Sequence, residues 1–257
     1  MTDATLATVR PPFGLMFGSL FRADFTVLMK SGRTLIINVA VPIFILVITN
    51  IGHSKLSFGN VGFEIGMALT YGLIASSLIG YSITVARDRD AGVFQRLRVT
   101  PAPTWTIMTS RLLVQVILNL VLTVVVVVIG SFIHHVAFNV GQYLLMLAVS
   151  LVGGAVFLSI GQTVVALIRS ATVVNAIGRL LYIILILVGI LGVSGLLGTT
   201  FQTISQWSPV GAVIDLFSGV LDLSHWSSID TNAIIACAIY IAVCTFVGIR
   251  WFHWEAR

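Results

Sequence analysis

The chain has 257 residues, of which 58% are hydrophobic and only 9% are charged, and its formal net charge at pH 7 is +5. Soluble globular domains carry about 25% charged residues, so this composition excludes a water-soluble enzyme or binding domain. It is typical of an all-α membrane protein, because this length accommodates about six spans of about 20 residues with short connections.

The first predicted element is an amphipathic helix over residues 13–30. Its apolar residues recur at three- and four-residue steps: Phe13, Phe17, Leu20, Phe21 and Leu28. Arg22, Asp24 and Lys30 are interspersed among them. We expect this helix to lie in the cytoplasmic interface of the membrane, as an anchor rather than as a gate for substrate.

Six apolar stretches follow, each close to the length that a membrane-spanning helix needs. They cover residues 35–51, 65–86, 112–133, 143–168, 180–197 and 233–249. Runs of β-branched residues such as 121–129 do not alternate with polar residues, as the strands of a membrane barrel would. Helices are therefore predicted for all six stretches. Pro42 should kink the first of them, either as a packing adjustment or as a hinge.

The basic residues predict the orientation of these spans. All but one of the 14 Lys and Arg residues fall on the same side of the predicted membrane, and the exception is Lys55. The positive-inside rule places that side, with both termini, in the cytoplasm. The outer side then holds most of the histidines and several acids: His53, His134, His135, His225, Glu64, Asp215, Asp222 and Asp230. The basic balance is thus a topology signal, and no nucleic-acid partner is expected.

The cytoplasmic loop between the second and third spans is the most charged segment of the chain. Val93, Phe94 and Leu97 nevertheless share one face of a predicted helix, which Pro101 ends. An ordinary solvated loop has no reason to present such a face to water. The pattern indicates a helix over 87–101 that packs on a cytosolic protein or on the membrane interface.

The outer segment 199–230 precedes the last span. Its apolar stretch, Val210–Val220, is too short to cross a membrane and lies between Trp207 and Trp226. Both tryptophans suit the headgroup level. A re-entrant or interfacial helix and a structured outer loop are both compatible with this pattern.

Several kinds of chemistry are missing from the sequence. It contains no G-x-x-x-x-G-K-[ST] phosphate loop, no H-E-x-x-H and no C-x-x-C. We therefore expect no catalytic residue, no metal site and no cofactor on this chain. Cys237 and Cys244 are expected to be packing residues. No acid lies in the middle of any span, which disfavours a carrier coupled to protons or sodium.

Polar groups inside the predicted spans need partners. Asn38, Asn119, Gln162 and Asn175 are expected to bond neighbouring helices. Arg179 is expected to extend towards the interface, because a span that starts at Leu180 is still long enough to cross. A start near Ala171 would instead place Arg179 about two turns inside the membrane, where a charge is costly unless it extends to the interface or faces a wet cavity.

One local motif carries a family resemblance. The loop reads Arg87-Asp88, Gly92, Leu97 and Thr100-Pro101, Arg111 stands at the start of the third span, and Trp207-Ser208-Pro209 precedes the last one. Together with the order of elements, this resembles the permease subunits of ABC-2 type exporters, which include drug-resistance permeases of the daunorubicin type. The chain departs from that pattern at the end of the fifth span, which has Ser194-Gly195 but no proline beside it.

The resemblance implies a single transmembrane domain over 1–257, in the plasma or inner membrane, that lacks an ATPase of its own. Two copies of a cytosolic ABC ATPase subunit, carrying ATP and magnesium, would work with this permease and a second one, identical or related, among membrane lipids. The ATPase would dock on a coupling helix formed by Arg87, Asp88, Arg89, Gly92, Val93, Phe94, Arg96, Leu97 and Pro101.

The same resemblance implies export of a hydrophobic or amphipathic substrate, such as a drug, antibiotic or lipid. The path would run between the two permeases, and Asn38, Pro42 and Arg179 are its candidate residues. Two other functions remain open. One is a stand-alone channel or secondary carrier, and the other is a membrane-embedded lipid enzyme using His134, His135 or His225 as a base.

Overall fold

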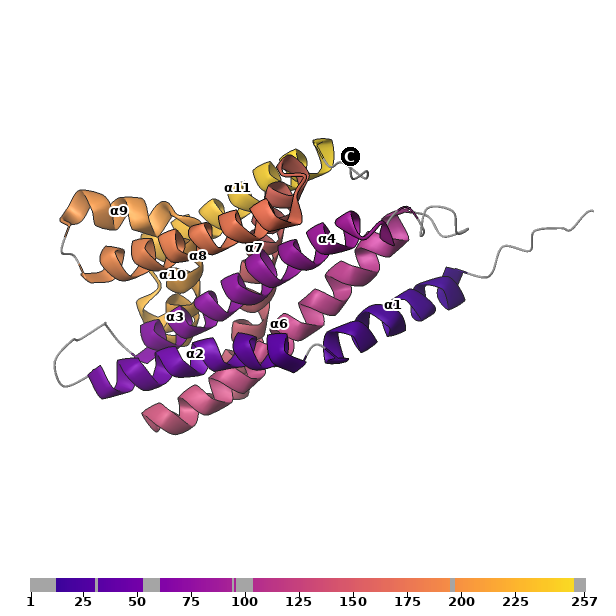
Figure 1. The fold of residues 1–257 in the computed structure, drawn as a ribbon. Helices are drawn as coiled ribbons and strands as arrows, with labels where there is room; N and C mark the ends of the chain where they lie inside the picture. Colours follow the sequence, from indigo (N-terminus) through magenta and orange to yellow (C-terminus); the bar gives the residue numbers. More distant parts are fainter. Residues whose placement is uncertain are drawn as a thin grey trace, which may run out of the picture.

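A computed structural model describes residues 13–30, 32–52, 61–93, 95, 104–194 and 197–251, and the chain forms an elongated bundle of helices (Figure 1). Every regular element within these residues is helical, which confirms the predicted all-α class. The elements are α1 (Phe13–Lys30), α2 (Gly32–Gly52), α3 (Val61–Leu73), η1 (Ile74–Gly80), α4 (Tyr81–Asp90), α6 (Thr104–His134), α7 (Val140–Leu167), α8 (Ala171–Ser194), α9 (Thr199–Trp207), α10 (Pro209–Leu221), η2 (Leu223–His225) and α11 (Ser228–Arg250).

Within the described part of the chain, five helical segments are long and apolar enough to cross a membrane. They are Val61–Asp90, Thr106–His134, Val140–Leu167, Ala171–Gly192 and Ser228–Arg250. These helices contain most of the predicted second to sixth spans. The predicted first span, 35–51, lies within α2, where Asn38–Thr49 is a shorter apolar helix. The six-span topology therefore stays a prediction.

Several helix ends differ from the predicted span limits, and three of them bear on the site. The second span was expected to end at Ala86, but the helix continues to Asp90. The third was expected from 112, but α6 begins at Thr104, immediately after Pro103. The fifth was expected over 180–197, but α8 begins at Ala171. Extra turns beyond the apolar core are physically reasonable, because about 20 residues suffice to cross it.

The second span is a single helix with a wide middle segment. α3, η1 and α4 follow one another without a break, and η1 is a π-helix over Ile74–Gly80. Such segments are rare and often occur at functional sites. Pro42 of α2 packs against Gly72 just before this segment, at the contact between α2 and α3.

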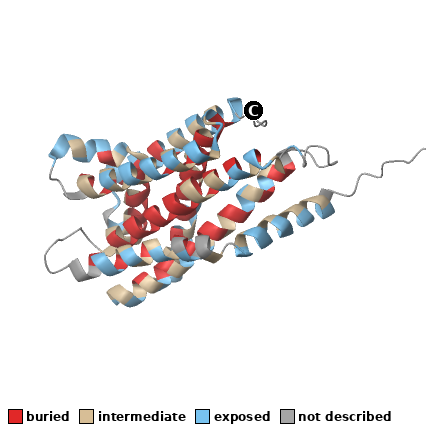
Figure 2. Cartoon of the chain, in the orientation of Figure 1, coloured by how far each residue is buried: buried red, intermediate tan, exposed pale blue. Residues whose placement is uncertain are grey.

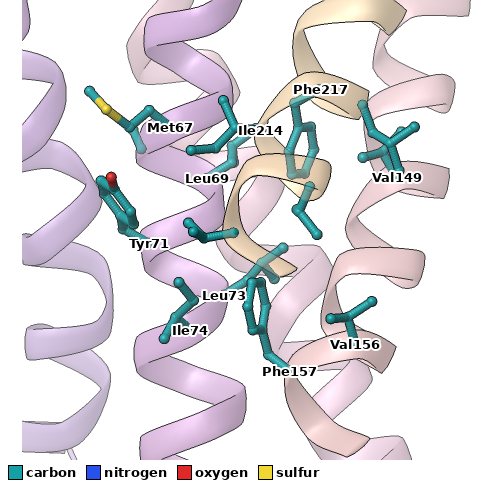
Figure 3. Packing of buried hydrophobic residues seen from close by; sticks show 14 of the residues in the cluster. Met67, Leu69, Tyr71, Leu73, Ile74, Val149, Val156, Phe157, Ile214 and Phe217 are labelled. Atoms are coloured by element: carbon teal, nitrogen blue, oxygen red, sulfur yellow. The ribbon is translucent and has the colours of Figure 1, made fainter. Parts of the chain in front are cut away.

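The core of the bundle surrounds this second span. Its side chains interlock with those of α7 and α10, among them Leu73, Phe157 and Phe217 (Figure 3). Buried residues gather in the middle of the bundle, whereas α1 and the outer parts of α8 and α11 are largely exposed (Figure 2). The second span is therefore the central helix of the fold.

The outer segment before the last span forms two helices, α9 and α10. Ser208 accepts a hydrogen bond from the N–H of Gly211 and so begins α10, with Pro209 in the first turn. Most of α10 is buried among α3, α7 and α11. The predicted short apolar helix at 210–220 is thus confirmed, and its place in the core excludes a plain surface loop.

The peripheral helices present apolar side chains outwards. In the most apolar stretch of Val61–Asp90, 78% of the residues are buried, compared with 22% in the corresponding stretches of α8 and α11. The exposed residues include Leu180, Ile184 and Leu187 on α8 and Ile239 and Phe246 on α11. Exposing apolar faces of this size to water is unfavourable, so lipid or another membrane subunit must cover them.

Candidate functional site

The charged motif residues lie at the end of α4, at the same end of the bundle as the beginning of α1 and the end of α11 (Figure 1). Arg87, Asp88 and Arg89 form the last turn of this helix. The prediction that they belong to a separate loop helix is therefore wrong. No helix breaker occurs between Arg87 and Asp90, so the helix continues to Asp90, two residues before Gly92.

Gly92 ends α4 because of its backbone conformation. Its φ is +69°, in the left-handed region that residues with a Cβ rarely adopt. The N–H of Gly92 donates to the carbonyl of Arg89 at 3.0 Å, and that of Ala91 to the carbonyl of Arg87 at 2.9 Å. The chain turns here, and Val93 and Gln95 again have helical geometry. Phe94, Arg96, Leu97 and Pro101 lie outside the described residues.

Arg89 points into the bundle and not towards a docking partner. Its side chain is among the largest fully buried ones, and the residue is 1% exposed. The guanidinium donates to the carbonyl oxygens of Val165 at 2.9 Å, Ile168 at 2.7 Å and Arg169 at 2.7 Å. These carbonyls lie in the last turn of α7 and just after it. The last four carbonyls of a helix lack partners within the helix, and the helix dipole favours a cation at this end. The expected docking role of Arg89 is thus not compatible with its position.

Asp90 contacts the beginning of the next helix. Its Oδ2 accepts a hydrogen bond from the N–H of Ala171, the first residue of α8, at 3.0 Å. A carboxylate at a helix N-terminus satisfies a free donor and matches the helix dipole. This contact explains why α8 begins nine residues before the predicted span.

A second cluster joins α4 to α1 and α6. Arg111 of α6 forms an ion pair with Asp88 and lies 3.9 Å from Asp24 of α1. The hydroxyl of Ser110 donates to Asp24 at 2.6 Å. Burial raises the pKa of Asp24, while the bond from Ser110 and the charge of Arg111 act in the opposite direction. Sequence reasoning noted Arg111 and the motif acid separately but did not predict that they pair.

This cluster predicts how firmly α1 is held. Replacing Arg111 with glutamine should remove both ionic contacts and weaken the docking of α1 by about 1 kcal/mol, or roughly fivefold in the local opening equilibrium. Hydrogen exchange of the α1 amides checks this, with the exposed Arg22→Gln as the control. Equal exchange rates in the two variants would contradict the role of Arg111.

A cavity of about 450 Å³ lies beside the end of α4. It is lined by Arg87, Asp90, Ala91, Ala171, Thr172 and Asn175. Among the described residues, the buried Oδ1 of Asn175 has no hydrogen-bond partner. Charges of both signs therefore line an open recess between α4 and α8.

The candidate path residues do not come together. Asn38 and Pro42 are buried on the side of α2 that faces the second span, with Asn38 near Gly80. Arg179 is exposed on α8, about two turns after its start. The helix that contains the fifth predicted span begins nine residues before Leu180, and the point at which it enters the membrane stays a prediction. The structure does not group these three residues into one site.

The expected bonds between spans are present for two of the amides. Asn119 accepts from Ser76 at 2.7 Å and donates to Ser77 at 2.8 Å, both in the π-helix. Gln162 accepts from Tyr81 at 2.9 Å. Sequence reasoning did not single out Ser76 and Ser77, because hydroxyls in apolar stretches commonly bond their own helix backbone.

The opposite end of the bundle brings together Glu64 and His134, two of the residues predicted to be on the outer side, while His53 of that set lies outside the described residues. His134 at the end of α6 lies 3.6 Å from Glu64 at the start of α3, and both side chains are almost completely buried. His135 is exposed and has a φ of 53°, and the side chain of His225 lies outside the described residues. His134 thus faces a carboxylate inside the protein and not an open substrate site.

Comparisons with known proteins agree with this arrangement. The family description "ABC-2 type transporter" matches residues 16–221. The chain is also 24% identical over 145 residues to a protein of Bacillus subtilis (strain 168) named "Putative transport permease YvfS". That alignment covers 56% of this chain and 59% of the relative. The match over most of the chain, together with helices able to cross a membrane, shows that this membrane protein belongs to the ABC-2 type transporter family.

Proposed function

We propose that this chain is the permease subunit of an ATP-binding cassette exporter. It moves a hydrophobic or amphipathic substrate, such as a drug, an antibiotic or a lipid, out of the cytoplasm or the inner leaflet. The observation that carries this proposal is the family match over 16–221, combined with the packing of α7 and α8 against α4 and the ion pair between Asp88 of α4 and Arg111 of α6. ATP and magnesium bind to a separate cytosolic ATPase subunit.

The ATPase docks on the segment that follows α4. Val93, Phe94 and Leu97 supply its apolar contacts, while Arg87 and Arg96 lie at the rim. Arg87 is exposed and Val93 is half-buried, which supports an accessible surface at this point. Since Arg89 is buried, the docking surface does not include it.

The working assembly contains two permeases and two ATPase subunits. The exposed apolar faces of α8 and α11 support this, because a second permease, identical or related, covers part of them and lipid covers the rest. Substrate passes between the two permeases, along the first, second and fifth predicted spans. The assembly lies in the plasma or inner membrane with both permease termini in the cytoplasm.

Apolar walls support the proposed class of substrate. The acids of the described spans lie near helix ends, as Glu64, Asp88 and Asp90 do in Val61–Asp90. In the middle of the second and third predicted spans, hydroxyls and amides bond one another around Asn119. Such a surface suits an uncharged or amphipathic molecule better than a small ion.

Purification with the partner tests the proposal directly. The permease should co-purify with a phosphate-loop ATPase, and proteoliposomes of the complex should transport daunorubicin, used as a probe, only when ATP is supplied. Transport by the permease alone, unaffected by ATP, would identify a channel or secondary carrier. Lipid turnover that the His134→Ala variant abolishes would identify an enzyme.

The docking surface makes a separate prediction. Val93→Asp should weaken ATPase binding by about 2–4 kcal/mol, roughly 30- to 1,000-fold, because a carboxylate would be desolvated in an apolar contact. Leu97→Asp should act in the same direction. Binding is measured with the purified ATPase and permease in nanodiscs.

The control for this experiment is Val140→Asp, at an exposed position at the start of α7. It carries the same chemical change at the opposite end of the bundle and should keep ATPase binding at the parent level. If Val93→Asp and Leu97→Asp both bind the ATPase normally, the docking surface lies elsewhere.

A further inference from the structure

Two neighbouring residues at the end of α4 reach across to the connection between α7 and α8. Arg89 bonds the carbonyl of Val165 in the last turn of α7 and the carbonyls of Ile168 and Arg169 in the connection. Asp90 bonds the first N–H of α8. The last turn of one membrane helix is thereby joined to the end of a second and the start of a third.

The Arg89 contact has the properties of a rigid joint. Its planar guanidinium makes three hydrogen bonds of 2.7–2.9 Å to backbone atoms, and backbone acceptors cannot rotate away as side chains can. Because the residue is 1% exposed, water offers no competing partner. A lysine at this position would present a single ammonium and could not reproduce the fixed fork of donors.

The Asp90 contact is independent of the first and weaker. Asp90 is exposed, so its bond to Ala171 competes with water. It nevertheless acts on α8 directly, whereas Arg89 acts through the turn before α8. The two contacts together hold the start of α8 against the end of α4 from two sides.

Contacts further along α8 continue towards the outer end of the bundle. The hydroxyl of Ser205 in α9 donates to the carbonyl of Val188 in α8 at 2.9 Å. α8 itself is peripheral, with 22% of its apolar stretch buried, so it can shift more readily than the central second span, of which 78% is buried. A displacement of the start of α8 would therefore reach α9.

We propose that Arg89 and Asp90 are positioning residues that transmit movement of the segment after α4 to α8 and, through Ser205, to α9. This inference rests on the proposed function, because the docked ATPase supplies the movement. Docking and transmission belong to different residues: the segment from Val93 binds the partner, and Arg89 and Asp90 pass its displacement on.

The experiment measures the effect of nucleotide at α9. A cysteine replaces the exposed Thr200 in a chain whose Cys237 and Cys244 are changed to alanine, and the complex with the ATPase is placed in nanodiscs. The labelling rate with a hydrophilic maleimide is measured without nucleotide and with ATP plus vanadate. We expect nucleotide to change this rate by about fivefold, the lower end of couplings between distant sites.

Removal of either contact should diminish this response while the ATPase stays bound. Asp90→Ala lies at an exposed position and should fold normally, and Arg89→Gln removes the fork of donors. Asp90→Asn retains an acceptor oxygen for the N–H of Ala171 and should preserve the response. Arg250→Gln, an exposed arginine at the end of α11, is the matched control for Arg89→Gln.

The possible results separate the two proposals. If Asp90→Ala and Arg89→Gln bind the ATPase and respond to nucleotide as the parent does, the transmission role is overturned and the proposed function stands. A parent complex that binds the ATPase but shows no nucleotide effect at position 200 also overturns transmission. If the parent binds no ATPase, the proposed function fails and transmission fails with it. If Arg89 had only a structural role, Arg89→Gln would lower the thermal stability and leave the nucleotide response unchanged.

Discussion

Replacing Arg89 with methionine is expected to lower the free energy of unfolding by about 3 kcal/mol. Methionine keeps much of the side-chain volume but donates no hydrogen bond. The carbonyls of Val165, Ile168 and Arg169 would then lose a charged donor at the end of α7. Buried acceptors left without a partner cost about 1–3 kcal/mol each, and entry of water at this end of the bundle would recover part of that sum.

Thermal and denaturant unfolding of the purified permease in detergent, followed by tryptophan fluorescence, measures this loss. Arg250→Met is the matched control, because Arg250 is exposed in the last turn of α11. Surface substitutions of this kind change stability by no more than about 0.5 kcal/mol. Equal unfolding midpoints for the Arg89 and Arg250 variants would show that the bonds to α7 contribute nothing to stability.

The second large effect is expected at Gly161 in α7. A Cβ at this position would lie 2.7 Å from the Oγ of Ser82 and 3.2–3.3 Å from the carbonyl oxygens of Ser77 and Leu78. Those carbonyls belong to the backbone of the π-helix, which cannot rotate out of the way. Gly161→Ala should therefore lower the free energy of unfolding by about 1–3 kcal/mol, despite the better helix propensity of alanine.

A glycine in α8 provides a control for which the expected change in the free energy of unfolding has the opposite sign. A Cβ at Gly178 would meet no heavy atom within 4 Å outside its own local backbone. Gly178→Ala should raise the free energy of unfolding by about 0.5–1 kcal/mol, because alanine loses less backbone entropy in a helix. If both alanine variants were stabilised alike, α7 and the π-helix would not be in contact at Gly161.

The contacts at Arg89 and at Gly161 both hold the second span in place. Its middle is fixed to α6 and α7 by Asn119 and by the close approach at Gly161. Its end is fixed to the α7–α8 connection by Arg89. A helix held at both levels moves with its neighbours rather than alone, as the proposed transmission from α4 to α8 requires.

Local sequence patterns predicted the elements of this fold well. The amphipathic helix at 13–30 agrees with α1 at both ends. The apolar stretches from 65 onward fall in long helices, because a chain in lipid must satisfy its own backbone hydrogen bonds. Glu64 and His134, which the charge pattern places on the same side, lie together in the structure.

The ends of the helices were harder to predict, because they depend on contacts distant in the chain. The apolar pattern placed the start of the fifth span at Leu180, but α8 begins at Ala171, where Asp90 binds its first N–H. The loop motif was expected to form a helix of its own, but its first residues complete α4 until Gly92 turns the chain. No local pattern reveals that Asp90 lies beside Ala171.

By itself, the sequence determined that this protein is a bundle of membrane helices with a charged segment after the second span. Apolar run length and charge placement are local properties and can be read directly. Only the tertiary structure decided which arginines at the end of α4 are exposed and which are buried. Arg87 and Arg89 are two residues apart, yet Arg87 is exposed and Arg89 is buried against α7. The physical reason is that an arginine can be buried only where acceptors are supplied, and α7 supplies them from 76 residues away.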